Sequence, residues 1–156
     1  MEHPAQIGRW CIRFDPDLTR ELYALCAGVD CECSDCANFL AAGELAFSPP
    51  FVQLLRQLGV DPGKPAELCH YGSSGDPMPT QGWFHIVGHI ESGRDAWRQV
   101  GENAYNLDPE PFAGMTGIGF SSRLSQVPEP FEGYGLIQLE FETIVPRVAP
   151  APSVNN

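Results

Sequence analysis

The sequence predicts an α+β fold with a mainly antiparallel sheet of about five strands and two or three helices, in the N-terminal half, packed on one side of it. Two observations support this class. The predicted elements follow the order strand, helices, then several strands, and the last strand alternates apolar and polar side chains, as a strand with one wet face does. The length of 156 residues and the 43% of apolar residues suit a single globular domain, which we expect over residues 1–146.

The N-terminal half begins with a strand and continues with helices. Residues 8–14 alternate apolar and polar side chains with the period of a half-buried strand. The helix that follows has Asp15 as its predicted N-cap. After a cysteine-rich segment, a short helix is predicted with Ser34 or Asp35 as its cap. The clearest helix covers residues 48–59, with a serine cap, a proline in the first turn and a terminal glycine.

The C-terminal half is mainly strand by prediction. Residues 65–72 and 81–90 indicate two strands separated by a loop rich in Gly, Ser, Asp and Pro. Residues 92–105 carry a helical pattern, although it contains a glycine. Residues 114–124 form a Gly-rich strand whose glycines indicate close strand packing or a bulge, because their spacing fits no phosphate-binding loop.

The strongest strand signal lies near the C-terminus, in residues 135–145. Its alternating residues are Ile137, Leu139 and Phe141 on one face and Gln138, Glu140 and Glu142 on the other. This period predicts one face in the core and one wet face. Residues 147–156 are rich in Pro, Ala, Ser and Asn, so we expect a disordered tail there.

The net charge indicates which kind of partner the protein binds, and the hydropathy pattern indicates where the protein is located. The formal net charge of −11 repels nucleic-acid phosphates and anionic lipid, so we expect neither nucleic-acid nor membrane binding. We expect a protein partner instead, with a basic surface. No export signal and no run of about 18 apolar residues are visible, which predicts a cytoplasmic protein with reduced cysteines.

The segment "DCECSDCANF" is the most specific motif, because it places three cysteines within six positions. Its spacing, Cys-x-Cys-x2-Cys, suits a structural zinc site if the chain turns tightly there. Reduced thiols packed without metal and a redox pair are the alternatives. The candidate zinc ligands are Cys31, Cys33, Cys36 and His85, with Cys26, Cys69 or His70 left open as the fourth ligand.

The preferred histidine follows from strand geometry. His85 and His89 are separated by about 13 Å along an extended strand, whereas the ligands of one zinc lie within about 4 Å of each other. At most one of them is therefore a ligand, and His85 lies in the more central segment. Acidic residues interleave with the thiols, and since nearby carboxylates disfavour a thiolate, the redox interpretation is the least favoured.

Four short motifs together support a resemblance. In order along the chain, "DCECSDCANF", "GWFHIVG", "VPEPF" and "LIQLEFETIVP" resemble a group of short bacterial and phage-type proteins with a CxCxxCxNF cluster and a late QLEF strand. The resemblance would span residues 8–146. It implies a single bacterial cytosolic or phage-linked domain and brings no catalytic residue with it.

Three functions are consistent with these patterns. The favoured one is a non-enzymatic, acidic module of the inhibitor or immunity type, which binds a protein and is held together by zinc or packed thiols. The second is a zinc-dependent hydrolase in which Cys33, Cys36 and His85 hold the metal and Glu32 or Glu91 is the base. The third is a thiol redox sensor that forms a reversible disulfide between Cys33 and Cys36.

Overall fold

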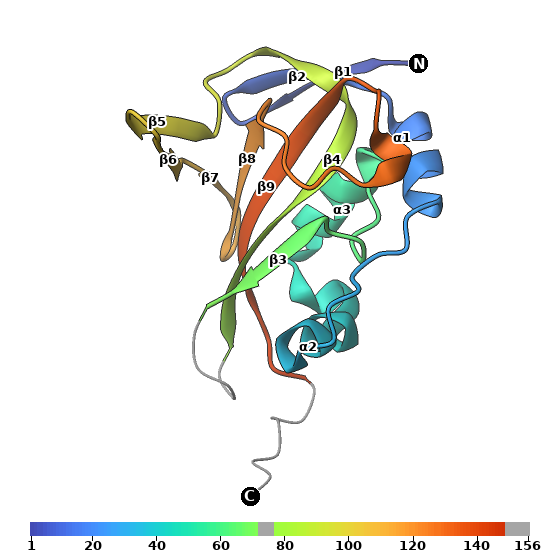
Figure 1. Cartoon of the computed structure of the whole chain (residues 1–156), viewed down its shortest axis with the longest axis vertical. Coiled ribbons are helices and arrows are strands. Elements are labelled where there is room, and N and C mark those ends of the chain that lie inside the picture. The colour runs from blue at the N-terminus through green and yellow to red at the C-terminus, as the bar shows by residue number, and fades with distance from the viewer. Residues whose placement is uncertain (72–76, 149–156) are drawn as a thin grey trace, which may run out of the picture.

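The computed structural model describes residues 1–71 and 77–148. Its sheet is organised around one long central strand, Met78–Ser92 (Figure 1). In chain order, the elements are β1 (His3–Ile7), β2 (Trp10–Phe14), α1 (Pro16–Ala24), α2 (Ser34–Ala42), the 3₁₀ helix η1 (Gly43–Ala46), α3 (Pro49–Gln57), β3 (Glu67–His70), β4 (Met78–Ser92), β5 (Trp97–Gly101), β6 (Ala104–Leu107), β7 (Glu110–Ala113), β8 (Thr116–Ser121), the 3₁₀ helix η2 (Glu129–Phe131) and β9 (Leu136–Val145). No helix in these described ranges is long and apolar enough to cross a membrane.

The strands form a main sheet in the order β1-β2-β4-β9-β8-β7, with β3 paired to β4 as well. Every pairing is antiparallel. The α+β class and the antiparallel sheet are therefore confirmed. The predicted number of about five strands is wrong, because the described sheet has seven. The two strands that were not predicted are β1 and β7, which are short and contain proline, so neither shows the alternation that marks a strand.

The three α-helices lie on one face of the sheet, as expected (Figure 1). Helical structure is not confined to the N-terminal half, because η2 forms a further turn at Glu129–Phe131. Asp15 caps α1 as predicted, since its Oδ1 accepts the backbone N–H of Leu18 at 3.0 Å. The cap of α2 differs from the prediction, because Cys33 occupies it in place of Ser34 or Asp35.

A cluster of aromatic rings joins the helices to the sheet. The ring of Phe47 lies between α2 and α3, and its centroid is 5.6 Å from that of Phe39 and 5.2 Å from that of Phe51. It also contacts Phe84 of β4 at 6.2 Å and Phe141 of β9 at 5.1 Å. Edge-to-face pairs of this kind add to the free energy gained from burial. The cluster holds α2, and with it the cysteine segment, against the sheet.

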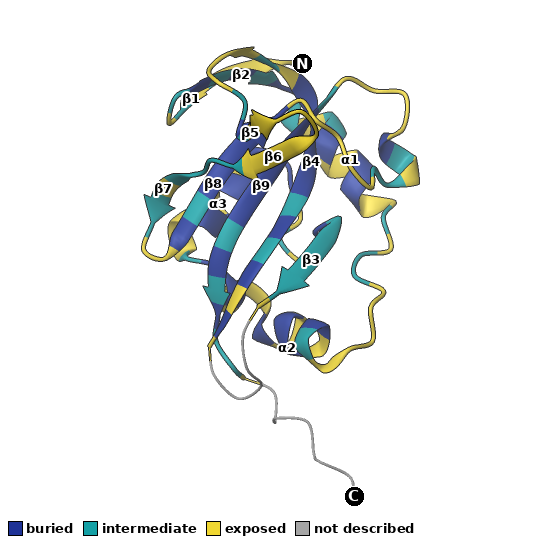
Figure 2. Ribbon diagram, turned by 60° about the vertical axis from the view of Figure 1, so that its left-hand side comes forward, coloured by how far each residue is buried: buried dark blue, intermediate teal, exposed yellow. Residues whose placement is uncertain are grey.

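Residues 92–105 do not form the predicted helix. They contain part of a separate two-stranded hairpin, β5–β6, which turns after Gly101. The helical pattern fails because Asp95 accepts the backbone N–H of Trp97, and Ala96 is hydrogen-bonded to the backbone of Phe120 and Asp108. These bonds direct the hairpin across the polar face of the main sheet (Figure 2).

The hairpin changes the expected exposure of the last strand. Ile137, Leu139 and Phe141 are in the core as predicted. The opposite face is not wet along its whole length, because Gln138 is only 2% exposed and Glu140 only 3%. Tertiary packing over β9 therefore buries a carboxylate that alternation alone would leave in water.

The chain continues in an ordered path past the expected domain boundary at 146. The amide of Asn38 in α2 donates to the carbonyl of Pro146 at 3.0 Å and accepts the N–H of Val148 at 2.9 Å. Arg147 forms an ion pair of 3.3 Å with Asp35. The first two residues of the predicted tail are thus bound to α2, while residues 149–156 lie outside the described ranges.

Candidate metal centre

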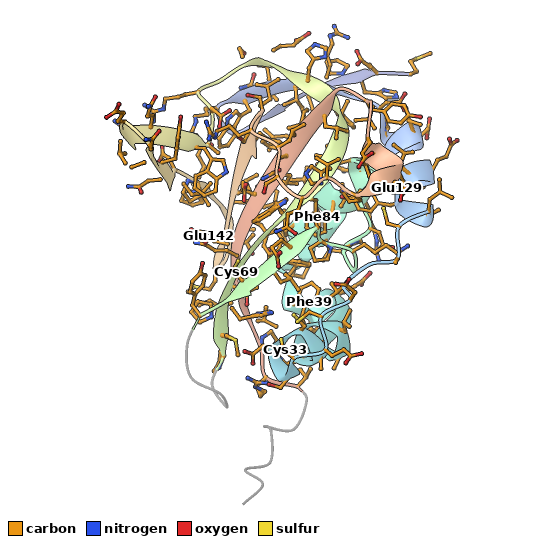
Figure 3. All side chains as sticks on the ribbon, in the orientation of Figure 1. Cys33, Phe39, Cys69, Phe84, Glu129 and Glu142 are labelled. Atoms are coloured by element: carbon orange, nitrogen blue, oxygen red, sulfur yellow. The ribbon has the colours of Figure 1, made fainter. Side chains whose placement is uncertain are left out.

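The three clustered cysteines lie together at the N-terminus of α2, where Cys33 is labelled in Figure 3, and Cys36 contacts His70 at the end of β3. The Sγ atoms of Cys31, Cys33 and Cys36 all lie within 4.8 Å of one another. The turn that this requires comes from the helix cap, because the Sγ of Cys33 accepts the backbone N–H of Cys36 at 3.4 Å. Thiolates bound to one zinc are about 3.8 Å apart, given Zn–S bonds of about 2.3 Å. A shift of about 1 Å would bring the three sulfur atoms to that separation.

His70 is the fourth candidate ligand that the structure brings to this cluster. Its Nε2 lies 3.5 Å from the Sγ of Cys36. That separation fits an S–H···N hydrogen bond, and it also equals the distance of about 3.5 Å between a sulfur and a nitrogen ligand of one tetrahedral zinc. Cys31 and Cys33 would complete a Cys₃His set, a common combination in structural zinc sites. Only the three sulfur atoms lie within 4.8 Å of one another, so Nε2 would have to move closer to Cys31 and Cys33 to share an ion with them.

The hydroxyl of Thr80 contacts the carbonyl of Met78 at 3.2 Å and the Nδ1 of His70 at 3.1 Å. The tautomer with the proton on Nδ1 satisfies both contacts, because Nδ1 then donates to Thr80 and Thr80 donates to Met78. This tautomer leaves the lone pair of Nε2 for Cys36. Metal-bound histidines are usually oriented in this way, through a hydrogen bond from the other ring nitrogen. Burial lowers the pKa of His70, which favours the neutral ring that a metal requires.

His85, the preferred fourth ligand in the sequence analysis, lies elsewhere. Its Nε2 donates to the Oε1 of Gln138 at 3.1 Å, and its ring packs against Phe131. The strand register pairs His70 with Thr80, and His85 is five residues further along β4, which is about 16 Å on an extended strand. His85 was preferred because β4 is the more central strand. The residue that contacts the cysteine cluster comes instead from the adjacent strand β3.

The other two open candidates also lie apart from the cluster. Cys69 precedes His70 on β3, and neighbouring strand residues point to opposite faces of a sheet. Its surroundings confirm this placement, because burial and the charges of Glu67 and Glu140 raise the pKa of its thiol. The Sγ of Cys26 lies 3.4 Å from the carbonyl of Leu22 at the end of α1.

The two thiols of the Cys33-x2-Cys36 pair differ in acidity. The backbone N–H of Cys36 lowers the pKa of Cys33, which is exposed at the helix N-terminus. Burial and the sulfur atoms of Cys33 and Cys31 raise the pKa of Cys36. The pKa shift of Cys33 comes mainly from hydrogen bonds donated at the N-terminus of α2, which favour its thiolate.

A buried cation lies beside the site. Arg147 is only 10% exposed and pairs with Asp35, and both residues are near enough to His70 to shift its pKa, Asp35 upward and Arg147 downward. The Nε and Nη1 atoms of Arg147 have no hydrogen-bond partner within the described part of the chain. A zinc ion with three thiolates and one neutral histidine carries a net charge of −1, which this guanidinium would balance.

Comparisons with known proteins assign no role to these residues. No protein-family model, no curated protein and no solved structure matches the chain. The resemblance to short bacterial and phage-type proteins stays a prediction, and the function has to be argued from the site. The local sequence did contain a signal for His70, because it lies in an amphipathic strand beside Cys69, but that signal did not distinguish it from His85.

Proposed function

We propose that this chain is a binding protein whose fold is held together by a structural zinc ion on Cys31, Cys33, Cys36 and His70. The observation that carries the proposal is the approach of the His70 Nε2 to the Cys36 Sγ, at 3.5 Å, while Nδ1 contacts the Thr80 hydroxyl at 3.1 Å. Four protein ligands complete the tetrahedron of a structural zinc and leave no position for a reacting water.

The zinc would hold a segment that lacks regular secondary structure. The segment between α1 and α2 has no regular secondary structure from Val29 to Glu32. The ion would tie this segment and the first turn of α2 to the end of β3. Structural zinc sites contribute on the order of 10 kcal/mol to folding, which is comparable to the whole stability of a typical domain.

The hydrolase alternative receives less support from the geometry. It required Glu32 or Glu91 as a base beside an open metal position. Glu91 forms an ion pair with Arg13 at 2.6 Å, at the end of β4 that pairs with β2. That end is about 36 Å along the strand from Thr80, which supports His70. Glu32 is exposed at the surface.

The partner that suits this protein is another protein with a basic surface. The 20 acidic residues exceed the nine basic ones, so the chain attracts cationic surfaces and repels anionic ones. An inhibitor or immunity protein would act in this way. A pulldown from the host at low and at physiological salt checks this role, and recovery of no partner under either condition would count against it.

Metal analysis tests the zinc site directly. The protein is purified without chelator, and zinc is measured for the wild type and for Cys33→Ser, His70→Ala and Cys11→Ser. We expect one zinc per chain in the wild type and a loss of at least about tenfold in affinity in the first two variants. Cys11→Ser is the matched control, because its thiol bonds to Gln6 on the β1–β2 hairpin and should leave zinc binding unchanged. Unchanged zinc affinity in His70→Ala would refute the assignment of this ligand.

A thiol switch is the second candidate, supported by the unequal pKa values of Cys33 and Cys36. Mild peroxide would oxidise both thiols to a disulfide, with reduction of the peroxide to water and release of any zinc. Mass spectrometry after this treatment checks the reaction. Two unmodified thiols would leave the structural role of the cluster as the better account.

A further inference from the structure

A second site lies on the polar face of the sheet, where the β5–β6 hairpin crosses it. The cavity has a volume of about 590 Å³, and its walls include Trp83, Trp97 and Tyr105 from three different strands. Glu140 and Gln138 of β9 line it as well, and Arg123 belongs to the loop after β8. This combination of aromatic walls and a carboxylate is separate from the cysteine cluster.

The carboxylate of Glu140 is held in a defined position. Its Oε1 accepts the indole N–H of Trp97 at 2.7 Å and the amide N–H of Gln138 at 2.6 Å. Gln138 is oriented in turn, because its Oε1 accepts from the backbone N–H of Ser125 at 2.7 Å and from His85. Such a network preorganises the charge, so a ligand would not have to order it on binding.

The charge of Glu140 has no basic partner of its own. No ion pair within residues 1–71 and 77–148 includes this carboxylate, although its side chain is 97% buried. Burial raises the pKa of Glu140, which shows that the ionised form lacks full compensation. Its Oε2 accepts none of the hydrogen bonds in these ranges, and Glu140 lines the cavity. A cation that entered the cavity could pair with that oxygen.

The aromatic walls favour a cation for a second reason. The face of an aromatic ring carries negative electrostatic potential. In this structure, the guanidinium of Arg123 lies 3.7 Å from the centre of the Tyr105 ring, so one of the walls already binds a cation of the chain itself. The indole of Trp83 is fixed by a bond of 2.9 Å to the carbonyl of Ser125. The rings are therefore firm surfaces against which a ligand could pack.

We propose that this cavity binds an organic ammonium group, which pairs with Glu140 and packs against Trp83, Trp97 and Tyr105. The inference rests on the binding role proposed above and is independent of the zinc. An ammonium carried by a lysine side chain of a partner protein and a free quaternary ammonium share this chemistry. An anion would suit Arg123 alone, since Arg123 is exposed at the rim while the buried Glu140 repels negative charge.

The test is an NMR titration of the zinc-loaded protein that follows the indole N–H signals of Trp83 and Trp97. The probes are choline, Nα-acetyl-lysine amide and 3,3-dimethylbutanol, which has the shape of choline without its charge. Choline or the lysine amide should bind at least about tenfold more tightly than the alcohol, because only a charged ligand gains the ion pair and the cation–π attraction. Tighter binding of the lysine amide would assign the site to a partner protein, and tighter binding of choline to a free ammonium.

Variants connect this binding to the named residues. Glu140→Gln and Tyr105→Ala should each weaken the better ammonium probe by about tenfold. Arg123→Gln should tighten it, because the competing guanidinium leaves the Tyr105 ring. Tyr134→Ala is the matched control, since Tyr134 has a similar exposure, 44% against 36% for Tyr105, and lies outside the cavity.

Three outcomes would overturn the inference. The first is binding of the alcohol as tight as that of both ammonium probes. The second is no response of either indole to any probe up to about 50 mM, which corresponds to negligible affinity. The third is binding of acetate that Arg123→Gln abolishes, which would make the cavity an anion site. His70→Ala should lose zinc and keep ammonium binding, while Glu140→Gln should keep zinc. A failure of one site therefore remains distinguishable from a failure of the other.

Discussion

Replacing Gly119 with alanine should move the β5–β6 hairpin away from the sheet. A Cβ atom on Gly119 would lie 2.5 Å from the Cβ of Ala96, at the base of the hairpin. Ordinary van der Waals contact begins near 3.4 Å, so Ala96 would have to move by about 1 Å. It cannot move freely, because its N–H donates to Phe120 at 3.0 Å and its carbonyl accepts from Asp108 at 2.7 Å.

The expected cost follows from overpacking in a region with fixed backbone bonds. Such substitutions lower the free energy of unfolding by about 1–3 kcal/mol, and these bonds place Gly119→Ala in the upper part of that range. With a urea dependence of about 2 kcal/mol per molar, the unfolding midpoint should fall by about 1 M. The indole N–H signal of Trp97 should also shift, because this residue follows Ala96 and bonds to Glu140.

Gly117→Ala is the matched control on the same strand and the same face. Its added Cβ would meet no atom closer than 3.5 Å, so the free energy of unfolding should change by less than about 0.5 kcal/mol. Urea unfolding followed by fluorescence compares the two variants. Equal midpoints for both, with an unshifted Trp97 signal in Gly119→Ala, would show that close approach at Gly119 does not hold the hairpin.

Three further predictions concern stability. Asp15→Ala should lower the free energy of unfolding by about 1 kcal/mol at neutral pH, as measured by urea unfolding. The Leu18 N–H lowers the pKa of Asp15, so this difference from the wild type should vanish as the pH falls through that pKa. Glu140→Gln should show the opposite trend, because burial raises the pKa of Glu140. The wild type loses folding stability as the pH rises through that pKa. The variant should therefore have the larger free energy of unfolding at neutral pH, but not in acid. Phe141→Ala should cost about 3–5 kcal/mol in the same assay, because it leaves a cavity beneath the Phe47 ring.

Local signals predicted the elements that depend on few residues. The sequence predicted the Asp15 cap, the proline at the start of α3 and the alternation in β9. Each of these signals depends on residues only a few positions apart, so a short stretch of sequence contains it whole. The hairpin at residues 97–107 was missed, because its hydrophobic spacing also fits a helix and its strands are held by bonds to Phe120 and Asp95. Propensity is a weak guide where such tertiary contacts decide.

The choice between two histidines shows the same limit at the candidate site. His70 and His85 both lie in segments that the sequence predicts to be strands, so the local pattern distinguishes them only by how central each segment is. Pairing of His70 with Thr80 across β3 and β4 decides instead, because it places Nδ1 beside the Thr80 hydroxyl and directs Nε2 toward Cys36. That pairing joins residues on two strands, and no short window contains it.

The sequence by itself determined the fold class, the helix that Asp15 caps and the cysteine spacing that three ligands of one metal require. These features arise from interactions between neighbouring residues, so composition and period reveal them. Only the tertiary structure decided that His70 faces the thiols and that Glu140 is buried beside Trp97. Both depend on strand register and on which element covers a face, and these are set by contacts between residues far apart in the chain.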